Sequence, residues 1–550
     1  MKILKDYRWL IFVVLIAAVL RFWQLGNIPP SLDWDEAALG YNAYSILKTG
    51  RDEYGVFLPM VLRSFDDYKP PLYAYLTIPA VAAFGLKPWA VRLPSVIMGI
   101  LAVIGTYFLV RELLKYSEQK FSFAIDHLSF DMPTVASLLL AISPWHIQFS
   151  RIAFEANTGV TLNIWAVFAF FYGLKSRRWL TISAFLSGLA LYAYHSERVF
   201  LPLLLLILTF LFWKELIAHK KSLVIGIIIG MITILPLLPV VFTGTSVTRL
   251  AGTSSLADET SLLSASVKKL EYDGAHHIFW GAMFDNRRLV WLQTVVNGYL
   301  SHYSFRWLFL TGDNPRHHAP DMALLYLWEM PFLLWGMFRV TKSGGRLPKI
   351  LWSWFFIAPI AASPTTELPH AIRTLVFLPV FQIFTSFGIL EFFNWFKKSP
   401  NVKNKLILSL TSVLVVFNIL LYLHMYFGHL NHETSEDWQY GYSQAVQYIR
   451  ANYSKYQKIV VSTKLEQPYM FFLFYLKYDP VKYLAEGGTH SGGFAEVKNK
   501  FAKYEFRPVN WGAEKKDHTI LYVSTPGEIP APGLLTVHYL DGTDAIRIAE

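Results

Sequence analysis

Long apolar stretches recur along most of the 550-residue chain, and short polar connections separate them. A helix needs about 20 apolar residues to cross the hydrocarbon core of a bilayer, which is ~30 Å thick. The pattern therefore predicts a polytopic α-helical membrane protein. We expect about eleven spans, at residues 7–25, 92–110, 133–149, 158–174, 179–195, 199–213, 222–242, 322–340, 350–362, 374–394 and 405–427.

A further apolar stretch, residues 71–88, is short for a span. Its flanking prolines leave about 15 helical residues, which reach only ~22 Å at a rise of ~1.5 Å per residue. If it is an interfacial helix and the N-terminus is cytoplasmic, every predicted cytoplasmic segment is basic, as cytoplasmic loops usually are. These segments lie around residues 2–8, 111–120, 175–178, 214–221, 339–349 and 397–405. Counting 71–88 as a span would place all the later clusters outside.

The same topology places the large polar segments on the extracytoplasmic side. They are residues 26–91, 150–157, 196–198, 243–321, 363–373 and 428–550. The last segment mixes strand-like runs ("KIVVST", "TILYVST", "LLTVHYL") with helix-like runs ("QAVQYIRANY", "QPYMFFLFYLKY"). We therefore predict a transmembrane domain at residues 1–430, with large external loops at 26–91 and 243–321, followed by an extracytoplasmic α/β domain at residues 431–550.

Composition supports this class of protein. The chain is 54% hydrophobic and has a mean hydropathy of +0.34, which a soluble domain of this length rarely reaches. It contains no cysteine, which excludes disulfides and thiolate chemistry. The net charge of +11 indicates basic cytoplasmic loops rather than a nucleic-acid surface, because the clusters fall where the topology predicts them. No small-residue cleavage site follows the first apolar run, so we expect an uncleaved span rather than a signal peptide.

The first external loop carries three carboxylates in the run "SLDWDE". Asp33 can cap a helix that begins at Trp34, and Glu36 stands at the position that completes a capping box. Asp35 then lies in the first helical turn, where backbone N–H groups favour an ionised carboxylate. It suits a general base or a metal ligand at headgroup level, although a solvated partner of the helix dipole explains it equally well.

The same loop ends in "DDYKPPLY", where Asp67 and Tyr68 precede Lys69. The two prolines after Lys69 stiffen the backbone and start the next helix. A lysine held at the membrane surface is a natural partner for a phosphate group. A lysine that only extends its charge to the interface is the common alternative.

Charged and aromatic residues recur at the predicted outer ends of the spans. A single arginine there is usually an interfacial anchor, but here nearly every outer connection carries one on the side that is otherwise poor in cations. The arginines are Arg92, Arg151, Arg198, Arg316 and Arg373. The accompanying candidates are Glu155, Tyr194, His195, His317 and His370.

Carboxylates and several cations at one membrane surface suit a lipid that carries a phosphate headgroup. A phosphate can leave without a proton, provided that positive charge stabilises it, while the incoming nucleophile needs a base. Asp35 would supply the base, and Lys69 with the arginines would supply the charge. Asp67 and Tyr68, together with the candidates of the other outer connections, would line the substrate site.

Three motifs in order resemble the GT-C glycosyltransferases. They are the acidic pair Asp35-Glu36 after the first span, the segment Lys69-Pro70-Pro71, and "RLPS" with Arg92. Within that class, the chain resembles the group of protein O-mannosyltransferases and the lipid A aminoarabinose transferase. The resemblance is strongest over residues 1–200 and continues through "NPRHHAP" and "PHAIRT" to about residue 430. It is the order of the motifs in a many-span chain, rather than any one motif, that is specific.

The resemblance implies transfer of a monosaccharide from a polyprenyl or dolichyl phosphate to an acceptor hydroxyl on the extracytoplasmic side, with inversion at the anomeric carbon. It also implies that Asp35, with Glu36 beside it, is the catalytic carboxylate and that Lys69 contacts the carrier phosphate. The mannosyltransferase branch usually has His-Pro-Pro at this place. The aminoarabinose enzyme has an acidic residue where this chain has Tyr68, so the sugar stays open. The acceptor can be a protein, a lipid or a polysaccharide.

Two other functions remain possible on the sequence. A flippase or transporter of lipid-linked glycans would place its charges near the bilayer midplane, whereas these charges collect at one surface. A ligase or polymerase that moves whole glycans would use the same carrier. The pairs His276/His277 and His317/His318 can be metal ligands, although adjacent loop histidines are more often solvated, so we assign no metal and no cofactor. We expect a multi-pass protein of a prokaryotic plasma membrane, with membrane lipids and no nucleic acid as partners.

Overall fold

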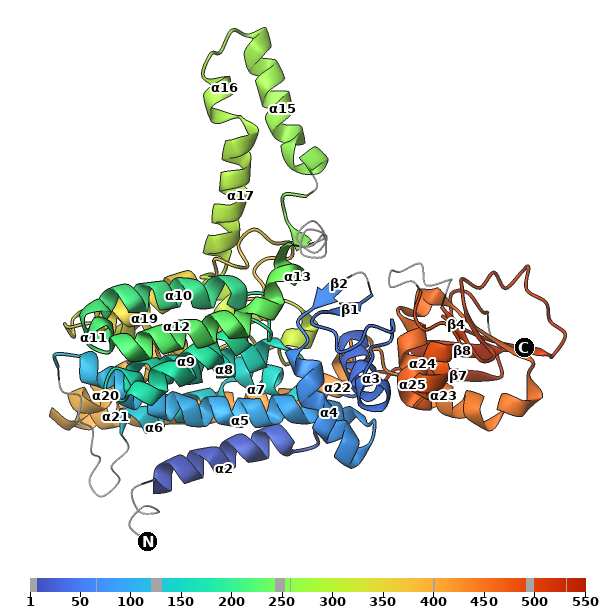
Figure 1. Cartoon of the computed structure of the whole chain (residues 1–550), viewed down its shortest axis with the longest axis horizontal. Helices are drawn as coiled ribbons and strands as arrows, with labels where there is room; N and C mark the ends of the chain where they lie inside the picture. The colour runs from blue at the N-terminus through green and yellow to red at the C-terminus, as the bar shows by residue number, and fades with distance from the viewer. Residues whose placement is uncertain are drawn as a thin grey trace. The chain divides into compact units, whose positions relative to one another are not determined.

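The computed structural model describes residues 7–65, 67–119, 131–242, 253–257, 259–398, 401–490, 499–530 and 532–550 (Figure 1). Parts of the predicted basic segments, namely residues 2–6, 120 and 399–400, lie outside these ranges. The chain forms two compact units. The first unit comprises Met1–Val13, Ala102–His146 and Gly159–Asn418, and the second comprises Val14–Leu101, Ile147–Thr158 and Ile419–Glu550.

The first unit is helical. Its helices are α6 (Met132–Ile142), α8 (Ala156–Gly173), α9 (Arg177–Ala190), α10 (Glu197–Leu211), α11 (Trp213–Ala218), α12 (Lys220–Ile234), α13 (Leu238–Phe242), α15 (Glu259–Ala275), α16 (Gly281–Phe284), α17 (Arg287–Ser301), α18 (Glu329–Thr341), α19 (Leu347–Ile357) and α20 (Val380–Lys398). Among the described residues, five helices contribute residues to both units: α2 (Arg8–Phe22), α5 (Pro88–Leu113), α7 (Pro144–Arg151), α8 and α21 (Val402–His424). Short π and 3-10 turns, among them η3 (Trp307–Thr311) and η4 (Pro315–His317), shape its connections.

Each of the predicted spans contains a helix. The helix of the first span is α2 (Arg8–Phe22). Within the described residues, four helical segments are long and apolar enough to cross a membrane: Pro88–Tyr116, Lys220–Val240, Leu375–Lys398 and Val402–Glu433. The protein therefore has a membrane-type helical fold, and the number of eleven spans stays a prediction. The stretch expected to be interfacial forms α4 (Leu72–Phe84), which is one of the shorter apolar helices.

Two glycines let α18 and α20 pack closely. A Cβ atom at Gly336 would collide with the carbonyl oxygen of Phe384, and one at Gly388 would collide with the carbonyl oxygen of Phe332. Small residues at such positions allow helix backbones to approach each other in membranes, where packing rather than hydrophobicity drives association. This contact is the tightest glycine-mediated helix approach among the described residues.

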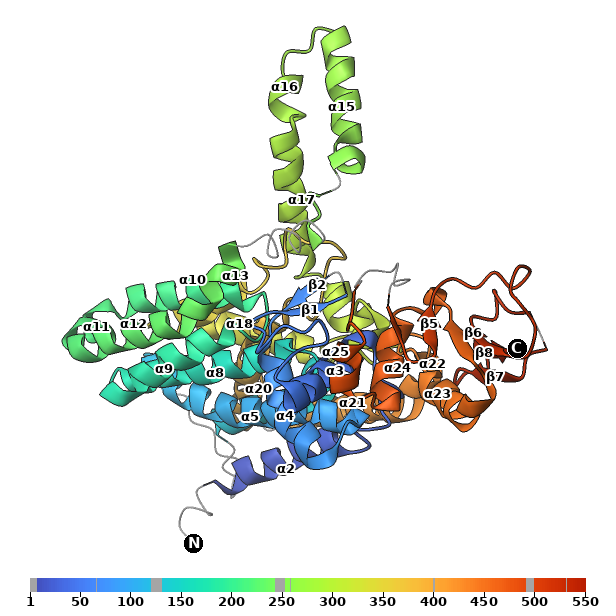
Figure 2. The same ribbon diagram turned by 45° about the vertical axis from the view of Figure 1, so that its right-hand side comes forward.

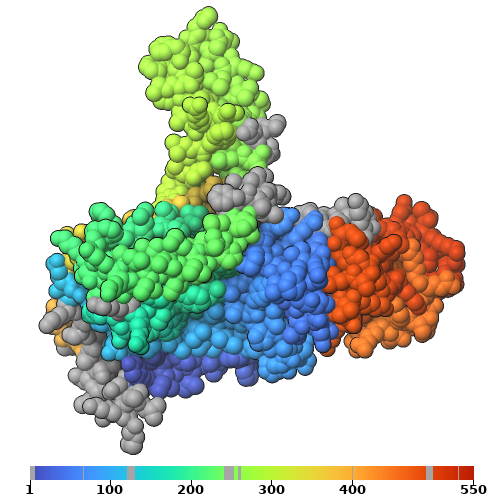
Figure 3. All heavy atoms as spheres, viewed as in Figure 1, coloured from blue at the N-terminus to red at the C-terminus, as the bar shows by residue number. Residues whose placement is uncertain are grey.

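A hairpin of helices stands out from the rest of the first unit. α15 and α17 lie side by side in Figures 1 and 2, and the same segment forms the projection in Figure 3. The exposed residues Phe279 and Trp280 lie in the connection between the end of α15 and the start of α16.

The second unit combines the first external loop with the C-terminal sheet. The loop contains α3 (Trp34–Thr49), β1 (Leu62–Ser64), β2 (Asp67–Lys69) and α4, and α7 (Pro144–Arg151) belongs mostly to this unit. The sheet has six strands in the order β4-β5-β3-β6-β8-β7, of which β3 is parallel to β5 and β6. The strands are β3 (Lys458–Val461), β4 (Lys500–Phe501), β5 (Tyr504–Phe506), β6 (Ile520–Ser524), β7 (Leu535–His538) and β8 (Asp544–Ala549).

Helices cover this sheet, as Figures 1 and 2 show. They are α23 (Tyr442–Ala451), α24 (Pro468–Leu476) and α25 (Pro480–Ala485), while the short helix α22 (Leu430–Glu433) follows α21. The predicted α/β character of the C-terminal region is thus confirmed, whereas its extracytoplasmic side stays a prediction. One apolar core joins Leu39 and Tyr41 of α3 to Phe474 of α24 and to Ile459 and Val523 of the sheet. The helix that carries Asp35 is therefore supported by the C-terminal region.

Candidate active site

The N-terminus of α3 has the capping box that the sequence predicts. The side chain of Asp33 accepts a hydrogen bond from the Glu36 N–H over 2.8 Å, and the Asp33 N–H donates to Glu36 Oε2 over 3.3 Å. Gly50 ends the helix in the left-handed conformation that glycine tolerates best. The cap fixes the direction in which the first turn presents its side chains, including that of Asp35.

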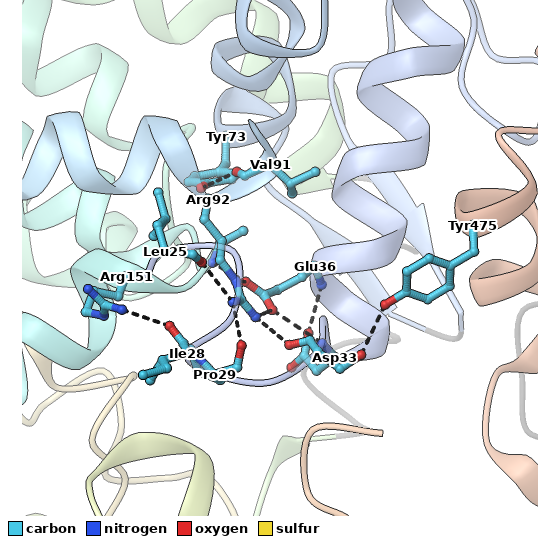
Figure 4. Close-up of polar contacts among 12 residues, drawn as sticks. Leu25, Ile28, Pro29, Asp33, Glu36, Tyr73, Val91, Arg92, Arg151 and Tyr475 are labelled. Carbon is cyan, nitrogen blue, oxygen red and sulfur yellow. Dashed lines mark hydrogen bonds and ion pairs between the residues drawn. The ribbon is translucent and has the colours of Figure 1, made fainter. Parts of the chain in front are cut away.

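Glu36 and Arg92 form an ion pair that solvent does not reach (Figure 4). Arg92 Nε donates to Glu36 Oε1 over 2.9 Å, and Arg92 Nη2 donates to Oε2 over 2.8 Å. The other N–H groups of Arg92 donate to the carbonyl oxygens of Leu25, Pro29 and Ser31. All five donors of this guanidinium are thus directed at protein acceptors, so we assign Arg92 to holding the loop in place rather than to binding phosphate.

Arg151 acts on the same loop. Its Nη1 donates to the carbonyl oxygens of Leu20 and Arg21, and its Nη2 donates to those of Trp23 and Ile28, over 2.7 to 3.1 Å. The guanidinium is buried and lies 5.4 Å from the ring centre of Tyr426 and 5.1 Å from that of Phe427. Arg151, like Arg92, therefore fixes the chain between α2 and α3, as Figure 4 shows for its bond to Ile28.

Asp35 and Lys69 form a second ion pair at the start of α3. The two-stranded ribbon β1–β2 presents Lys69 opposite Leu62. The Lys69 side chain is 9% exposed, whereas that of Asp35 is 30% exposed. Burial lowers the pKa of Lys69, but the carboxylates of Asp35 and Glu155 outweigh it, so the pKa lies above its ordinary value and the ammonium stays charged. A partly accessible carboxylate thus lies beside a buried cation.

The neighbours of this pair come from the same unit. Glu155 is buried, and its carboxylate and that of Asp67 both raise the pKa of Lys69. The Tyr68 N–H donates to the side chain of Asp67 over 2.7 Å within β2. The structure therefore brings together Asp35, Lys69, Glu155 and Asp67 within the second unit, which also contains the pair of Glu36 and Arg92.

The remaining predicted residues belong to the first unit, where they form two groups. One group lies at the start of α10, where Arg198 Nε donates to the Leu191 carbonyl oxygen over 3.2 Å and the Arg198 N–H donates to the His195 carbonyl oxygen over 3.1 Å. Tyr194 and His195 lie just before this helix. The other lies around η4 and the connection 363–373. Here Arg373 Nη1 donates to Thr365 Oγ1 over 2.8 Å, and the rings of His317 and His370 lie 5.0 Å apart. Arg316 belongs to the same turn, where its N–H donates to Asn314 Oδ1 over 2.9 Å.

Sequence reasoning missed several residues, of which two lie near the capping box and Arg92 in the second unit and one belongs to the group around η4 in the first unit. Tyr475 of α24 shares a 3.1 Å hydrogen bond with Ser31 beside the capping box. The guanidinium carbon of Arg92 lies 5.9 Å from the ring centre of Trp438. No sequence signal connects residues so far apart. Asp313 was also missed, although its place four residues before His317 is a spacing that brings side chains together on a helical turn.

Comparisons with known proteins define the class of the fold. Residues 68–239 match the family described as dolichyl-phosphate-mannose-protein mannosyltransferase. The structure is similar to that of ArnT from Cupriavidus metallidurans bound to undecaprenyl phosphate, with a TM-score of 0.54 and 12% identity over 98% of each chain. It is also similar to the oligosaccharyltransferase of Archaeoglobus fulgidus tethered with an acceptor peptide, with a TM-score of 0.51 and 14% identity over 96% of this chain and 70% of that one. The comparison with curated proteins found no match.

The chain therefore has the fold of the GT-C glycosyltransferases, and the resemblance predicted from its motifs is confirmed. The fold and its candidate spans make it a membrane protein. The matched family region begins at Tyr68, so it includes Lys69 but not Asp35. At these identities the two similar structures define the fold, and the chemistry has to be argued from the residues of this chain.

Proposed function

We propose that this protein transfers a monosaccharide from a polyprenyl-phosphate carrier to an acceptor hydroxyl on the extracytoplasmic side of the membrane. The observation that carries the proposal is the ion pair between Asp35, which is partly accessible, and Lys69, which is nearly buried. The similar ArnT structure holds undecaprenyl phosphate, which supports a carrier of this chemical class. The proposed orientation has a cytoplasmic N-terminus and an extracytoplasmic C-terminal sheet, in a prokaryotic plasma membrane.

In the proposed reaction, Asp35 takes the proton from the acceptor hydroxyl while the hydroxyl oxygen attacks the anomeric carbon. The bond between the anomeric carbon and the phosphate oxygen breaks, and its electron pair leaves with the carrier phosphate. Lys69 stabilises the negative charge on that phosphate, because an ammonium in a poorly hydrated site interacts strongly with an anion. Attack from the face opposite to the phosphate inverts the configuration.

Glu36, Arg92 and Arg151 have positioning roles in this proposal. Their hydrogen bonds hold the chain from Leu20 to Ser31, and Glu36 Oε1 also accepts from the Ala153 N–H over 2.7 Å. A base must be held within about an ångström of its working position, since small misplacements reduce the rate strongly. Arg198, Arg316 and Arg373 are proposed to contribute to carrier binding, and Asp67, Tyr68, Glu155, Tyr194 and His195 to line the substrate site.

The experiment that tests this function uses the full-length protein in liposomes with a panel of polyprenyl-phosphate monosaccharides. Membrane extract serves as the source of acceptors. We expect consumption of one donor, with release of polyprenyl phosphate and appearance of the sugar in an acceptor. Movement of intact donor across the bilayer without consumption would contradict the proposal in favour of a transporter. Consumption of only a lipid-linked oligosaccharide would contradict it in favour of a whole-glycan transferase.

A further inference from the structure

A cluster of three side chains in the first unit has a composition typical of metal sites. Asp313, His317 and His370 each offer one ligand atom, and these atoms all lie within 4.8 Å of one another. His317 Nδ1 lies 3.0 Å from Asp313 Oδ2. The cluster joins the turn at η4 to the connection 363–373, which are far apart in the sequence. We refer to these three residues as the Asp-His-His cluster.

Backbone contacts hold the cluster in place. The His317 N–H donates to the Asn314 carbonyl oxygen over 2.8 Å, which forms the turn that brings His317 back to Asp313. The Ala371 N–H donates to Asp313 Oδ2 over 2.7 Å, and the His370 N–H donates to His302 Nε2 over 3.3 Å. The two connections are therefore fixed relative to each other by groups outside the ligand atoms.

Two polar atoms of the cluster are buried without a partner among the described residues. They are Asp313 Oδ1 and His370 Nδ1. His317 is 5% exposed and His370 is 9% exposed, so solvent has little access to the rings. A buried polar atom without a hydrogen bond costs about 1–3 kcal/mol, and native structures rarely leave two of them together. A ligand that accepts electron pairs from both a carboxylate oxygen and an imidazole nitrogen would satisfy them.

We propose that the Asp-His-His cluster binds a divalent transition-metal ion. Two imidazoles and one carboxylate suit Zn²⁺ or Fe²⁺ and disfavour Mg²⁺ and Ca²⁺, which prefer oxygen ligands throughout. Bonds of about 2.0–2.2 Å to a tetrahedral ion place the ligand atoms roughly 3.3–3.6 Å apart. Side-chain rotations that move the ligand atoms by about an ångström would bring the three residues to this spacing. Three protein ligands leave a position open for water.

A phosphate group is the main rival ligand, because Arg316 and Arg373 lie in the same two segments. The carboxylate of Asp313 argues against it, since a second anion at a buried carboxylate is repelled. Arg373 Nη1 donates to Thr365 Oγ1 and to the Thr366 carbonyl oxygen. The donor set therefore favours a cation over an anion.

The test is metal binding by the full-length protein, purified without an added histidine tag and stripped with a chelator. Zn²⁺ is titrated by calorimetry, and bound zinc per chain is measured by elemental analysis. We expect one ion per chain and a loss of affinity of about a hundredfold or more in His370→Gln and in Asp313→Asn. His276→Gln is the matched control, because His276 is an exposed histidine directly after the end of α15 and does not belong to the cluster.

Unchanged zinc affinity in His370→Gln, or no zinc bound by the wild-type protein at micromolar concentration, would overturn the proposal. A second measurement needs no variant: the visible absorption of bound Co²⁺ reports nitrogen and oxygen ligands in a low-symmetry site, and its absence would also overturn it. Binding of inorganic phosphate that depends on His370 without metal would replace the proposal with an anion site. Each readout is independent of sugar transfer, so failure here is distinct from failure of the proposed function.

Discussion

Asp35 and Glu36 are adjacent in the sequence, but the fold gives them different surroundings. Glu36 is fully buried, and its carboxylate is satisfied by Arg92, the capping box and the Ala153 N–H. Asp35 keeps a side chain that is 30% exposed beside Lys69. Of the acidic pair, only Asp35 can therefore meet a substrate, and Glu36 positions it.

The capping box could be predicted from the sequence because its partners are three residues apart. The pairing of Glu36 with Arg92 could not be predicted, since it joins residues in different helices through a loop whose path the hydrophobic pattern leaves open. Arg92 and Arg151 were expected at the outer surface for their charge. They are instead buried among backbone carbonyl groups of the chain from Leu20 to Ser31, which the prediction of spans from hydropathy cannot detect.

Removal of one partner of the buried Glu36–Arg92 pair should destabilise the protein. Glu36→Gln leaves the guanidinium of Arg92 uncompensated, which typically costs about 3–5 kcal/mol in free energy of unfolding. Thermal unfolding in detergent measures the effect, and Glu271→Gln at an exposed position of α15 is the control. A loss below about 1 kcal/mol would show that solvent or another group compensates Arg92.

Glu53 gives the second unit a pH-dependent stability. Burial raises its pKa to about 7, although Thr489 and Asn42 donate hydrogen bonds to its carboxylate. Between the ordinary value of 4.5 and about 7, the folded state holds a proton that the unfolded state has released. The free energy of unfolding should therefore fall by about 3 kcal/mol as the pH rises through this window.

The measurement is the unfolding temperature against pH for the wild-type protein and for Glu53→Gln. The variant cannot ionise at this position, so its curve should be flatter between pH 4.5 and 7. Parallel curves would indicate that Glu53 ionises with an ordinary pKa in the folded protein.

At the scale of elements, the apolar stretches predicted where helices occur better than where they begin and end. The predicted span 133–149 is interrupted, because α6 ends before Pro144 and α7 begins there. The predicted span 322–340 is helical only from Glu329. Strands β3, β6 and β7 were predicted, whereas β4 and β5 have two and three residues and give no recognisable alternation. β8 was missed because Asp544 and Arg547 interrupt its apolar pattern.

The contact between α18 and α20 should tolerate no larger residue at its glycines. Gly388→Ala places a methyl group against the backbone of Phe332, so we expect a loss of roughly 2 kcal/mol or more in free energy of unfolding. Gly230→Ala in α12 is the matched control, because its Cβ would meet only Ala184 at 3.9 Å. There the helix propensity of alanine should stabilise by up to about 1 kcal/mol. Equal effects at the two sites would contradict the close packing.

At the scale of the whole molecule, the second unit is assembled from three stretches that are distant in the sequence. The proposed division at residue 430 separates transmembrane from extracytoplasmic chain, yet α3 of the first loop shares its core with α24. The sequence predicts that α3 and α24 each bury apolar residues. It cannot predict that they pack on each other, because hydrophobicity is not specific for a partner.

This shared core predicts that a change in the C-terminal region disturbs the first loop. Phe474 lies against Gly40 of α3 and is fully buried, so Phe474→Ala should cost about 3–5 kcal/mol in free energy of unfolding. It should also increase hydrogen exchange of the backbone amides in α3. Val481→Ala, at an exposed position of α25, is the control. Unchanged exchange in α3 would contradict a common core.

The central claim is that Asp35 is the base of a sugar transfer from a polyprenyl-phosphate donor. Its most direct test is the rate of transfer by Asp35→Asn at saturating donor, beside Asp517→Asn. Asp517 is a similarly accessible carboxylate that pairs with Lys515 in the same unit. We predict that Asp35→Asn lowers kcat by about 10²–10⁴-fold with little change in the KM for the donor, and that Asp517→Asn leaves both unchanged. A folded Asp35→Asn protein with the kcat of the wild type would contradict the account.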